Sequence, residues 1–211
     1  MKLFAGFAVL CCCLAAAGNL HIFDHDWAVP NASDWKIDTE DGASVLRLLV
    51  GKEPPANGPR RPMQFAIAET GDLPAVKLDA DVKPLGKSLM IVFAYRNADH
   101  FDYAHLSTDT AIVQPHHNGI FHVYGGERVR ISAEEGPAAF TESGRWHHVT
   151  LVWNGMTGEV RLQVNGNEIP ALQAVDLSLR RGKIGIGSFD ETGEFKNVKI
   201  ATVPPRRPSG P

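Results

Sequence analysis

The chain has 211 residues, of which 44% are hydrophobic, and this suffices for one domain with a sizeable core. Its formal net charge is −3, so it lacks the basic excess with which proteins bind the phosphates of nucleic acids. We therefore expect a single domain without a nucleic-acid partner.

The first eighteen residues are organised like a secretory signal peptide. Met1 and Lys2 form a short basic start, residues 3–14 are apolar, and residues 15–17 offer an alanine cleavage site. The apolar run is too short to span a bilayer, and no second such run follows. The sequence predicts a signal peptide over 1–18, a secreted or periplasmic bacterial protein, and no membrane span.

All three cysteines, Cys11, Cys12 and Cys13, lie inside this segment. Lipid attachment normally requires a small residue before the cysteine, whereas Leu10 precedes Cys11. We therefore expect ordinary cleavage rather than a lipoprotein. The mature chain would then contain no disulfide and no thiol for nucleophilic chemistry.

Most of the remaining chain has the two-residue hydrophobic period of β-strands. Between 75 and 82, for example, apolar side chains alternate with Lys77, Asp79 and Asp81. Turn signals rich in Gly, Pro and Asn separate the segments. The predicted strands are 20–23, 44–50, 63–68, 75–82, 88–95, 101–106, 120–124, 128–132, 146–153, 160–164, 182–187 and 195–201.

This pattern predicts an all-β fold, a two-sheet antiparallel β-sandwich spanning 19–203. Strand 20–23 is expected to pair near strand 195–201 and so bring the termini together. The proline-rich stretch 54–61 is expected to be a surface loop, where binding groups are often found. The Pro-rich tail 204–211 cannot pack a core and is expected to be disordered.

The strongest local signal is a hairpin between 146 and 164. Two alternating runs flank the turn from Asn154 to Gly158, and a glycine-alternating strand, 182–187, follows. The runs Trp146-His147-His148-Val149 and Val164-Asn165-Gly166 resemble the hairpin of laminin G-like domains, which belong to the concanavalin A-like lectin/glucanase superfamily.

The end of the chain supports the same resemblance. Residues 182–190 and 195–198 are similar to the closing strands of that superfamily, particularly of a secreted bacterial branch that includes 3-keto-disaccharide hydrolase-like domains. The resemblance implies a jelly-roll sandwich with one concave sheet, a carbohydrate-facing role, and sometimes a structural calcium ion near the joined termini. It does not decide function, because this fold contains lectins, hydrolases, lyases and adhesion modules. The E-x-D-x-x-E strand motif of laminarinase-type relatives is absent.

Histidines, tyrosines and arginines between 100 and 130 offer the best candidate site. Tyr103 and His105 share one face of a predicted strand, and the next strands could bring further such side chains beside them. Aromatic rings stack on sugars, whereas imidazole and guanidinium groups hold hydroxyl groups or the carboxylate of a uronic acid. The predicted ligand-binding residues are Tyr103, His105, His117, Asn118, His122, Tyr124, Arg128 and Arg130.

Other constellations support other chemistries. The pair Asp79 and Asp81 has a spacing that glycosidase carboxylates could use, but it also has the pattern of a solvated strand face. A Tyr–His pair could act as base and acid in β-elimination of an acidic sugar. The histidines could instead hold zinc, although no H-E-x-x-H motif occurs, or be rim residues without a shared ligand.

Asp24, Asp26 and Asp190 could form an oxygen cage for calcium if the termini meet. The expected cofactor is therefore none, or one structural calcium ion. The sequence contains no G-x-S-x-G motif, so it gives no support for serine hydrolysis. It also contains no glycine-rich loop before a helix, so it gives no support for phosphate binding.

We therefore predict a secreted, lectin-like carbohydrate-binding domain, expected to be a monomer, that recognises a polysaccharide or glycan on its concave sheet. A glycoside hydrolase or polysaccharide lyase of the same fold is the first alternative. A non-catalytic envelope or adhesion module with a protein partner is the second.

Overall fold

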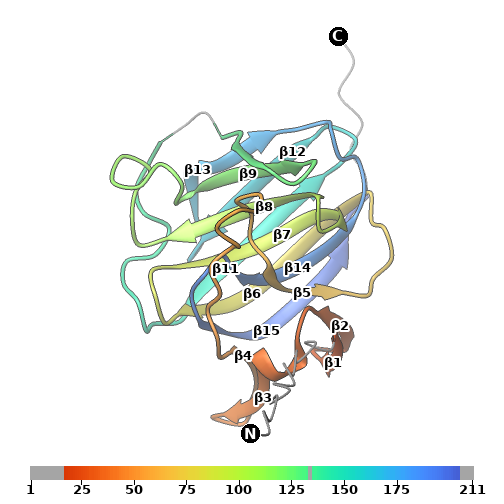
Figure 1. Cartoon of the computed structure of the whole chain (residues 1–211), viewed down its shortest axis with the longest axis vertical. Helices are drawn as coiled ribbons and strands as arrows, with labels where there is room; N and C mark the ends of the chain where they lie inside the picture. Colours follow the sequence, from red (N-terminus) through yellow and green to blue (C-terminus); the bar gives the residue numbers. More distant parts are fainter. Residues whose placement is uncertain (1–16, 133–134, 205–211) are drawn as a thin grey trace, which may run out of the picture.

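The computed structural model describes residues 17–132 and 135–204 (Figure 1). These residues form two antiparallel β-sheets packed face to face, so the predicted two-sheet β-sandwich is confirmed. The helical part of the described chain is a single 3-10 turn, η1 (Ala32–Asp34), and no described helix is long and apolar enough to cross a membrane. Residues 1–16 of the predicted signal peptide and residues 205–211 of the predicted tail lie outside the described residues.

The two sheets have eight and seven strands. The order of the eight-stranded sheet is β1 (Gly18–Ile22), β2 (His25–Val29), β5 (Gln64–Ala68), β14 (Lys183–Ser188), β7 (Ser88–Asn97), β8 (His100–Ser107), β9 (Gly119–Tyr124), β10 (Arg128–Arg130). The order of the seven-stranded sheet is β13 (Asn167–Val175), β12 (Glu159–Val164), β11 (His147–Asn154), β6 (Ala75–Pro84), β15 (Gly193–Thr202), β4 (Ala43–Leu48), β3 (Trp35–Glu40).

Alternation along the strands builds the core between the sheets. The apolar residues of β6 point inward and are buried, whereas Lys77, Asp79 and Asp81 point outward. Phe93 of β7 packs against Trp153 of β11 with ring centroids 5.9 Å apart. The main hydrophobic core therefore contains residues of both sheets.

The outer face of the eight-stranded sheet carries a second apolar cluster, and the glycines of β14 make room for it. A Cβ atom at Gly187 would lie 2.6 Å from the Cα of Phe65, so no side chain fits there. Across these glycines the ring of Phe65 reaches Phe101 on β8, with centroids 5.4 Å apart. We call this the outer cluster; its members are Phe65, Ile67, Met90, Val92, Phe101, Tyr103, Phe121, Val123 and Phe189.

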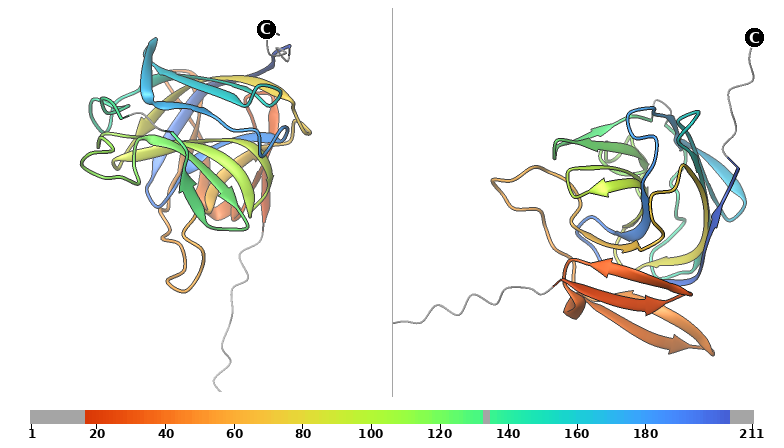
Figure 2. Two further views of the ribbon diagram at one scale, coloured as in Figure 1. Left: turned by 90° about the horizontal axis from the view of Figure 1, so that it is seen from above. Right: turned by 90° about the vertical axis from the view of Figure 1, so that its right-hand side faces the viewer.

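Loop 49–63, between β4 and β5, passes over the outer cluster. It crosses in front of β7 and β8 in Figure 1 and stands away from the body of the sandwich in Figure 2. Arg61 forms an ion pair with Asp99, and the backbone N of Arg60 donates a hydrogen bond of 3.4 Å to Glu127. Stretch 54–61 is therefore a loop, and it is tied to the end of the sheet that holds the candidate residues.

The predicted pairing of the first strand with the last is wrong. β1 pairs with β2 in the eight-stranded sheet, whereas β15 pairs with β4 and β6 in the other. Phe23 and Asp24, with φ of 56° and 59°, close a two-residue hairpin turn between β1 and β2. This local pairing closes a far shorter loop than pairing with the other end of the chain. The structure also contains strands β2, β3 and β13, which were not predicted from the sequence.

Candidate functional site

The strand register separates the predicted ligand-binding residues onto two sides of the sheet. β8 pairs with β9 so that Tyr103 lies opposite Phe121, and Asp102 lies opposite His122. Paired residues point to the same side, so Tyr103 points outward while His122 and Tyr124 point to the other side. The prediction that His122 and Tyr124 share a face with Tyr103 is therefore wrong, because one residue of register decides the face.

The outer face brings four of the predicted residues together. Tyr103 and His105 come from β8, and Arg128 and Arg130 come from β10. The rings of Tyr103 and Phe121 stack with centroids 5.2 Å apart and planes inclined by 13°. This part of the outer cluster therefore combines aromatic rings with cationic side chains.

His105 is buried in this cluster, with 1% of its surface exposed. Its Nδ1 donates a hydrogen bond of 2.8 Å to the backbone oxygen of His116, and its Nε2 has no partner among the described residues. Burial, together with the charge of His117, lowers the pKa of His105 to about 3. The ring is therefore neutral at pH 7, where it can accept a hydrogen bond but is a poor proton-transfer group.

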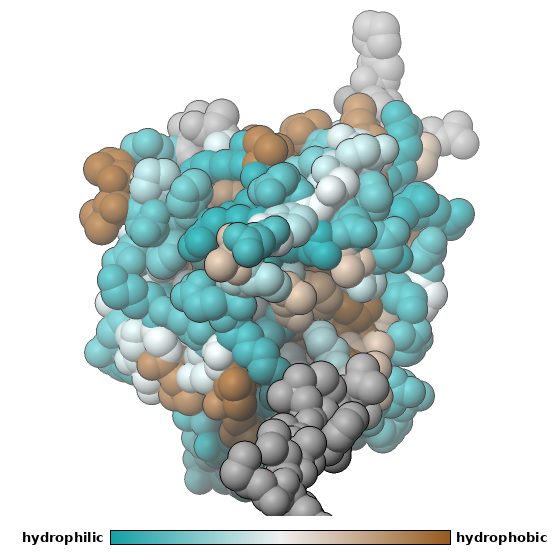
Figure 3. Space-filling model, in the orientation of Figure 1, coloured by the Kyte–Doolittle hydropathy of each residue, from teal (hydrophilic) through white to brown (hydrophobic). Residues whose placement is uncertain are grey.

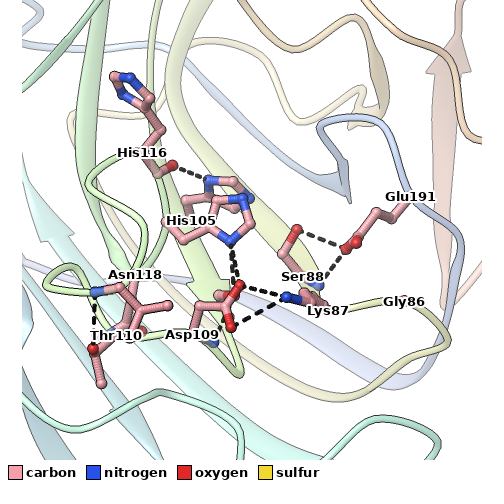
Figure 4. Close-up of polar contacts among 12 residues, drawn as sticks. Gly86, Lys87, Ser88, His105, Asp109, Thr110, His116, Asn118 and Glu191 are labelled. Carbon is pink, nitrogen blue, oxygen red and sulfur yellow. Dashed lines mark hydrogen bonds and ion pairs between the residues drawn. The ribbon is translucent and has the colours of Figure 1, made fainter.

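His117 lies at the rim, with its ring 4.9 Å from that of His105. Its Nδ1 is 3.1 Å from the Oγ of Ser107 and 3.4 Å from a carboxylate oxygen of Asp109, which also pairs with Lys87 at 3.1 Å. Figure 4 shows the carboxylate of Asp109 facing the ammonium group of Lys87. Burial lowers the pKa of His117, and Asp109 counteracts this effect.

A second rim group contains acidic residues. The Oγ of Ser88 donates a hydrogen bond of 2.9 Å to Glu191 (Figure 4). The next residue back, Asp190, is half-buried, and burial followed by the charges of Glu53 and Glu191 raises its pKa to about 6. Asp190 can therefore hold a proton under mildly acidic conditions.

Arg128 lies against aromatic rings on the outer face. Its guanidinium carbon is 4.3 Å from the ring centroid of Phe189 and 5.5 Å from that of Phe121. Its Nη1 donates a hydrogen bond of 3.3 Å to the hydroxyl of Tyr103, whose pKa burial raises to about 12. Within the described part of the chain, Arg128 forms no ion pair with a carboxylate. Most of its five donors therefore remain available.

Arg60 approaches the same ring, and His116 lies within electrostatic range of Arg60 and Arg128. The guanidinium carbon of Arg60, from loop 49–63, is 5.7 Å from the centroid of Phe189. Burial, and then the charges of Arg128 and Arg60, lowers the pKa of the exposed His116. We call Arg60, His116, Arg128 and Phe189 the Phe189 site.

Asn118 and Arg130 position the surrounding loops. Asn118 is fully buried; its Nδ2 donates to the backbone oxygen of Pro137 at 2.9 Å, and its Oδ1 accepts from the backbone N of Ala139 at 3.0 Å. The Nε of Arg130 donates to the backbone oxygen of Ser132 at 3.2 Å. These contacts show a structural role for both predicted ligand-binding residues.

On the opposite side of the sheet, His122 meets two carboxylates. Its Nδ1 is 2.6 Å from Asp102 and 2.9 Å from Asp176, and the ring of Tyr124 stacks on it at 5.7 Å. Burial raises the pKa of Asp102 to about 6, although the hydrogen bond from His122 opposes this. The same hydrogen bond raises the pKa of His122.

The three aspartates predicted to bind calcium do not gather in one place. Asp24 and Asp26 belong to the β1–β2 hairpin, where Asp26 lies 2.8 Å from His21. Asp190 follows β14 and has Glu53 and Glu191 as its charged neighbours. The premise of the predicted cage, the pairing of the first and last strands, is not met.

The pair Asp79 and Asp81 lies on the outer face of the seven-stranded sheet. Asp79 accepts a hydrogen bond of 2.7 Å from Thr150, and Asp81 lies 2.8 Å from His148 and 2.7 Å from Asn197. Burial would raise the pKa of Asp79, but Lys77 and Thr150 lower it. Hollows of about 460 and 720 Å³ lie on this face, and neither has a Phe, Tyr or Trp side chain among its described lining residues.

A smaller hollow lies on the outer face of the eight-stranded sheet. It has a volume of about 300 Å³, and Phe65 and Tyr95 supply aromatic surface at its wall. Lys183 and Glu69 form an ion pair of 2.5 Å at its edge. Most of the face drawn in Figure 3 is hydrophilic, with a limited area of apolar colour. On this face, Tyr95 is therefore partly exposed at the hollow, whereas Phe189 is buried, with 2% of its surface exposed.

Three residues of the Phe189 site are not among the predicted ligand-binding residues. Phe189 follows β14, Arg60 lies in the Pro-rich loop, and His116 lies in the turn before β9, so none belongs to the alternating strands from which the site was predicted. The available signals were the placement of Phe189 directly after a glycine-alternating strand and the Arg60-Arg61 pair within a predicted surface loop.

No protein-family model matches the chain, and no curated protein resembles it in sequence. Solved structures share its fold at low sequence identity. The carbohydrate-binding module CBM66 from Bacillus subtilis is similar with a TM-score of 0.58 and 13% identity, over 82% of this chain and 94% of that one. A putative glycosyl hydrolase from Parabacteroides distasonis has a TM-score of 0.53 and 15% identity, over 82% of this chain and 92% of that one. A protein of unknown function with a galectin-like fold from Bacillus subtilis has a TM-score of 0.51 and 14% identity, over 82% of this chain and 88% of that one. These likenesses concern the fold, which is the predicted two-sheet antiparallel β-sandwich.

Proposed function

We propose that this protein is a glycan-binding domain whose ligand carries a carboxylate, bound at the Phe189 site. The observation that supports this most directly is the Arg128 guanidinium, which stacks on Phe189 and has no carboxylate partner in the described chain. A guanidinium group pairs with a carboxylate through two parallel hydrogen bonds. A uronic acid supplies such a carboxylate, and the buried ring of Phe189 holds the guanidinium of Arg128 in place to receive it.

The surroundings of Arg128 support a saccharide rather than a simple anion. Arg60 and His116 add hydrogen-bond donors from exposed positions, and the hollow beside Tyr95 adds aromatic surface farther along the same face. Saccharides combine many hydroxyl groups with apolar ring faces, so they require both kinds of contact. Structures with a similar fold include one named a carbohydrate-binding module, which agrees with this proposal.

The proposal favours recognition over catalysis because of His105. The lowered pKa of His105 keeps this imidazole neutral, and its Nδ1 is already engaged with the backbone of His116. A proton-transfer residue is most effective when its pKa lies near the working pH. His105 therefore supports the cluster and offers at most an acceptor nitrogen.

Isothermal titration with uronic acid oligosaccharides, and with the same oligosaccharides after reduction of their carboxyl groups, tests the proposal. We expect the wild-type protein to bind at least one acidic oligosaccharide and to bind its reduced form at least tenfold more weakly. Arg128→Gln keeps a donor for Tyr103 but removes the charge, so it should weaken acidic binding at least tenfold. Added salt should weaken wild-type binding because the contact is between opposite charges.

The matched control is Arg145→Gln. Arg145 is an exposed arginine outside the Phe189 site, and it pairs with Glu142. It should bind like the wild type. Binding of reduced and acidic oligosaccharides with equal affinity would contradict the carboxylate, and unchanged binding by Arg128→Gln would contradict the site. The absence of binding to a broad array of acidic and neutral glycans would overturn the function itself.

Glycan cleavage is a second candidate, favoured by Asp190. Its pKa of about 6 suits a general acid, and Glu53 stands beside it as a possible second carboxylate. Incubation with a polysaccharide panel would then release new reducing ends or unsaturated uronates, and Asp190→Asn would abolish the release. No product across the panel would contradict this candidate and leave the binding proposal intact.

We also propose that the protein is exported, which rests on the basic start and apolar run of residues 1–17. Cleavage after Ala17 would leave β1, which begins at Gly18, whole. N-terminal sequencing of the exported protein should therefore start at or next to Gly18. A start at Met1 would contradict the proposal.

A further inference from the structure

Two carboxylates and one imidazole converge from two neighbouring strands of one sheet and from the residue that follows a strand of the other. Asp102 on β8 and His122 on β9 are directly paired across the eight-stranded sheet. Asp176 directly follows β13 of the seven-stranded sheet, which lies against β9. The three side chains thus come from both sheets, and no part of the Phe189 site contributes to them.

The cluster holds more acceptor atoms than it has hydrogen atoms to satisfy them. The Nδ1 of His122 lies 2.6 Å from Oδ1 of Asp102 and 2.9 Å from Oδ2 of Asp176, but it carries at most one hydrogen. That hydrogen bonds to Asp102, which leaves Oδ2 of Asp176 without a hydrogen-bond partner in the described chain. The other oxygen of Asp102 is also unpartnered, although only 1% of this residue is exposed.

Unpartnered carboxylate oxygens in a buried place are costly, because they have lost water without gaining a donor. The nearest basic group, His122, is a single imidazole between two carboxylates. A cation at this point would compensate both oxygens at once. The ligand atoms of the three residues all lie within 4.8 Å of one another, so small side-chain shifts would bring them to the bond lengths of about 2.0–2.2 Å that zinc requires.

We propose that Asp102, His122 and Asp176 bind one divalent transition-metal ion, and that zinc is the ion of choice. An imidazole nitrogen with two carboxylate oxygens suits Zn²⁺, whereas Ca²⁺ takes six to eight oxygen ligands. His122 and Asp176 each keep about 14% of their side chains exposed, so water can reach the site and complete the coordination. This site is separate from the aspartates expected to bind calcium.

The position of the site gives the ion a structural role. Asp102 and His122 belong to one sheet and Asp176 to the other, so a bound ion links the two layers. A metal that binds the folded but not the unfolded chain raises stability with its free concentration. The mature chain would have no disulfide, since all cysteines lie at 11–13, so the ion would add a strong link to the packing between the sheets.

The test uses the full exported chain without a polyhistidine tag, after treatment with a chelator. Titration calorimetry with ZnCl₂ should give one ion per chain, and calorimetric melting should show a Tm higher by about 5–10 °C at free zinc one hundredfold above its Kd. Asp176→Asn and His122→Asn should lose both effects. CaCl₂ at millimolar concentration should neither shift the Tm comparably nor displace zinc.

His148 with Asp81 provides the matched control, because it is another histidine–aspartate pair, at 2.8 Å, on the exposed face of the other sheet. Asp81→Asn should keep the full zinc effect. Asp176→Asn is the preferred site variant because Asp176 lies outside the strands, and its circular dichroism spectrum should match that of the wild type. A wild-type chain without stoichiometric zinc binding, or Asp176→Asn and His122→Asn variants that fold and retain it, would overturn the proposal. Glycan binding is measured separately, so either proposal can fail alone.

Discussion

At the scale of single residues, two buried tryptophans differ in one hydrogen bond. The Nε1 of Trp27 donates to the backbone oxygen of Ile22 at 2.9 Å, whereas the Nε1 of Trp153 has no partner among the described residues. Both side chains are at most 1% exposed. The indole groups therefore bury similar apolar surface but are satisfied to different degrees.

Replacing each tryptophan by phenylalanine should separate the two effects. Both variants lose packing, but Trp27→Phe also leaves the carbonyl of Ile22 without its donor, and Trp153→Phe removes an unsatisfied N–H. We expect Trp27→Phe to lower the free energy of unfolding in urea by about 1–3 kcal/mol more than Trp153→Phe. Equal losses, or a larger loss for Trp153→Phe, would contradict the assigned hydrogen bond.

The buried imidazole of His105 makes stability depend on pH. Its pKa is about 3 in the folded protein and near 6.5 in the unfolded chain, so between these values only the unfolded chain binds the proton. Its stabilising contribution is therefore complete above pH 6.5 and is lost as the pH falls toward 3, by up to about 1.4 kcal/mol per pH unit.

His105→Asn keeps a donor for the backbone oxygen of His116 and cannot titrate. The difference in unfolding free energy between wild type and this variant should stay constant above pH 7 and shift in favour of the variant as the pH falls from 6.5. Urea denaturation at half-unit pH steps measures it. Parallel pH profiles for the two proteins would show that His105 is not the responsible group.

The candidate site was only partly predictable at this scale. Alternation along one strand placed Tyr103 and His105 together, because the side-chain period within a strand is fixed. The faces of His122 and Tyr124 depended on the register between strands, which the turn before β9 sets and the local pattern does not. Phe189 reaches the site from a loop, and loops carry no period at all.

At the scale of elements, the glycines of β14 matter for the space they leave rather than for backbone flexibility. A Cβ atom at Gly187 would lie 2.2 Å from the backbone oxygen of Gln64 on the neighbouring strand. Gly71 is the opposite case, since its φ is +71° and nothing lies within 4 Å of its Cβ position. The two glycines are thus required for different physical reasons.

Gly187→Ala should therefore destabilise the protein by overpacking, and Gly71→Ala by backbone strain alone. We expect losses of about 3 kcal/mol or more for the first and about 1–2 kcal/mol for the second, measured as unfolding free energies in urea. The outer cluster should also loosen in Gly187→Ala, since Phe65 lies against the same position. A loss at Gly187 no larger than that at Gly71 would show that β14 shifts to accept the methyl group.

Strand positions and the β11–β12 hairpin were predictable at this scale, whereas the pairing of the first strand was not. The buried alternation of β6 and the glycines of β14 are visible in the sequence because each strand meets one buried and one outer environment. The pairing of β1 with β2 instead depends on the left-handed residues Phe23 and Asp24, which are not a turn sequence that the usual Gly and Asn signals identify.

At the scale of the whole molecule, the two sheets are expected to unfold as one unit. The main core joins residues of both sheets, and each sheet pairs strands from distant parts of the chain, such as Phe65 with Gly187 and Leu46 with Phe195. Neither sheet can then lose its strands without exposing the apolar face of the other. Ellipticity of the strands and fluorescence of Trp27 and Trp153, one in each sheet, should therefore report a single transition with the same midpoint.

The same long-range pairing should make folding slow. Each distant pair requires a long loop to close before the contact contributes, so we expect refolding in milliseconds to seconds in stopped-flow experiments rather than in microseconds. Trp27 lies in the eight-stranded sheet, whereas Trp35 and Trp153 lie in the seven-stranded sheet and Trp146 directly precedes one of its strands, β11. Trp27→Phe therefore leaves the indole fluorescence of the seven-stranded side, and the difference between wild type and this variant reports the eight-stranded sheet. If one sheet recovered its signal long before the other, or melted at a different midpoint, the sandwich would consist of two folding units. A metal ion that joins the sheets would then couple these two units rather than strengthen a single core.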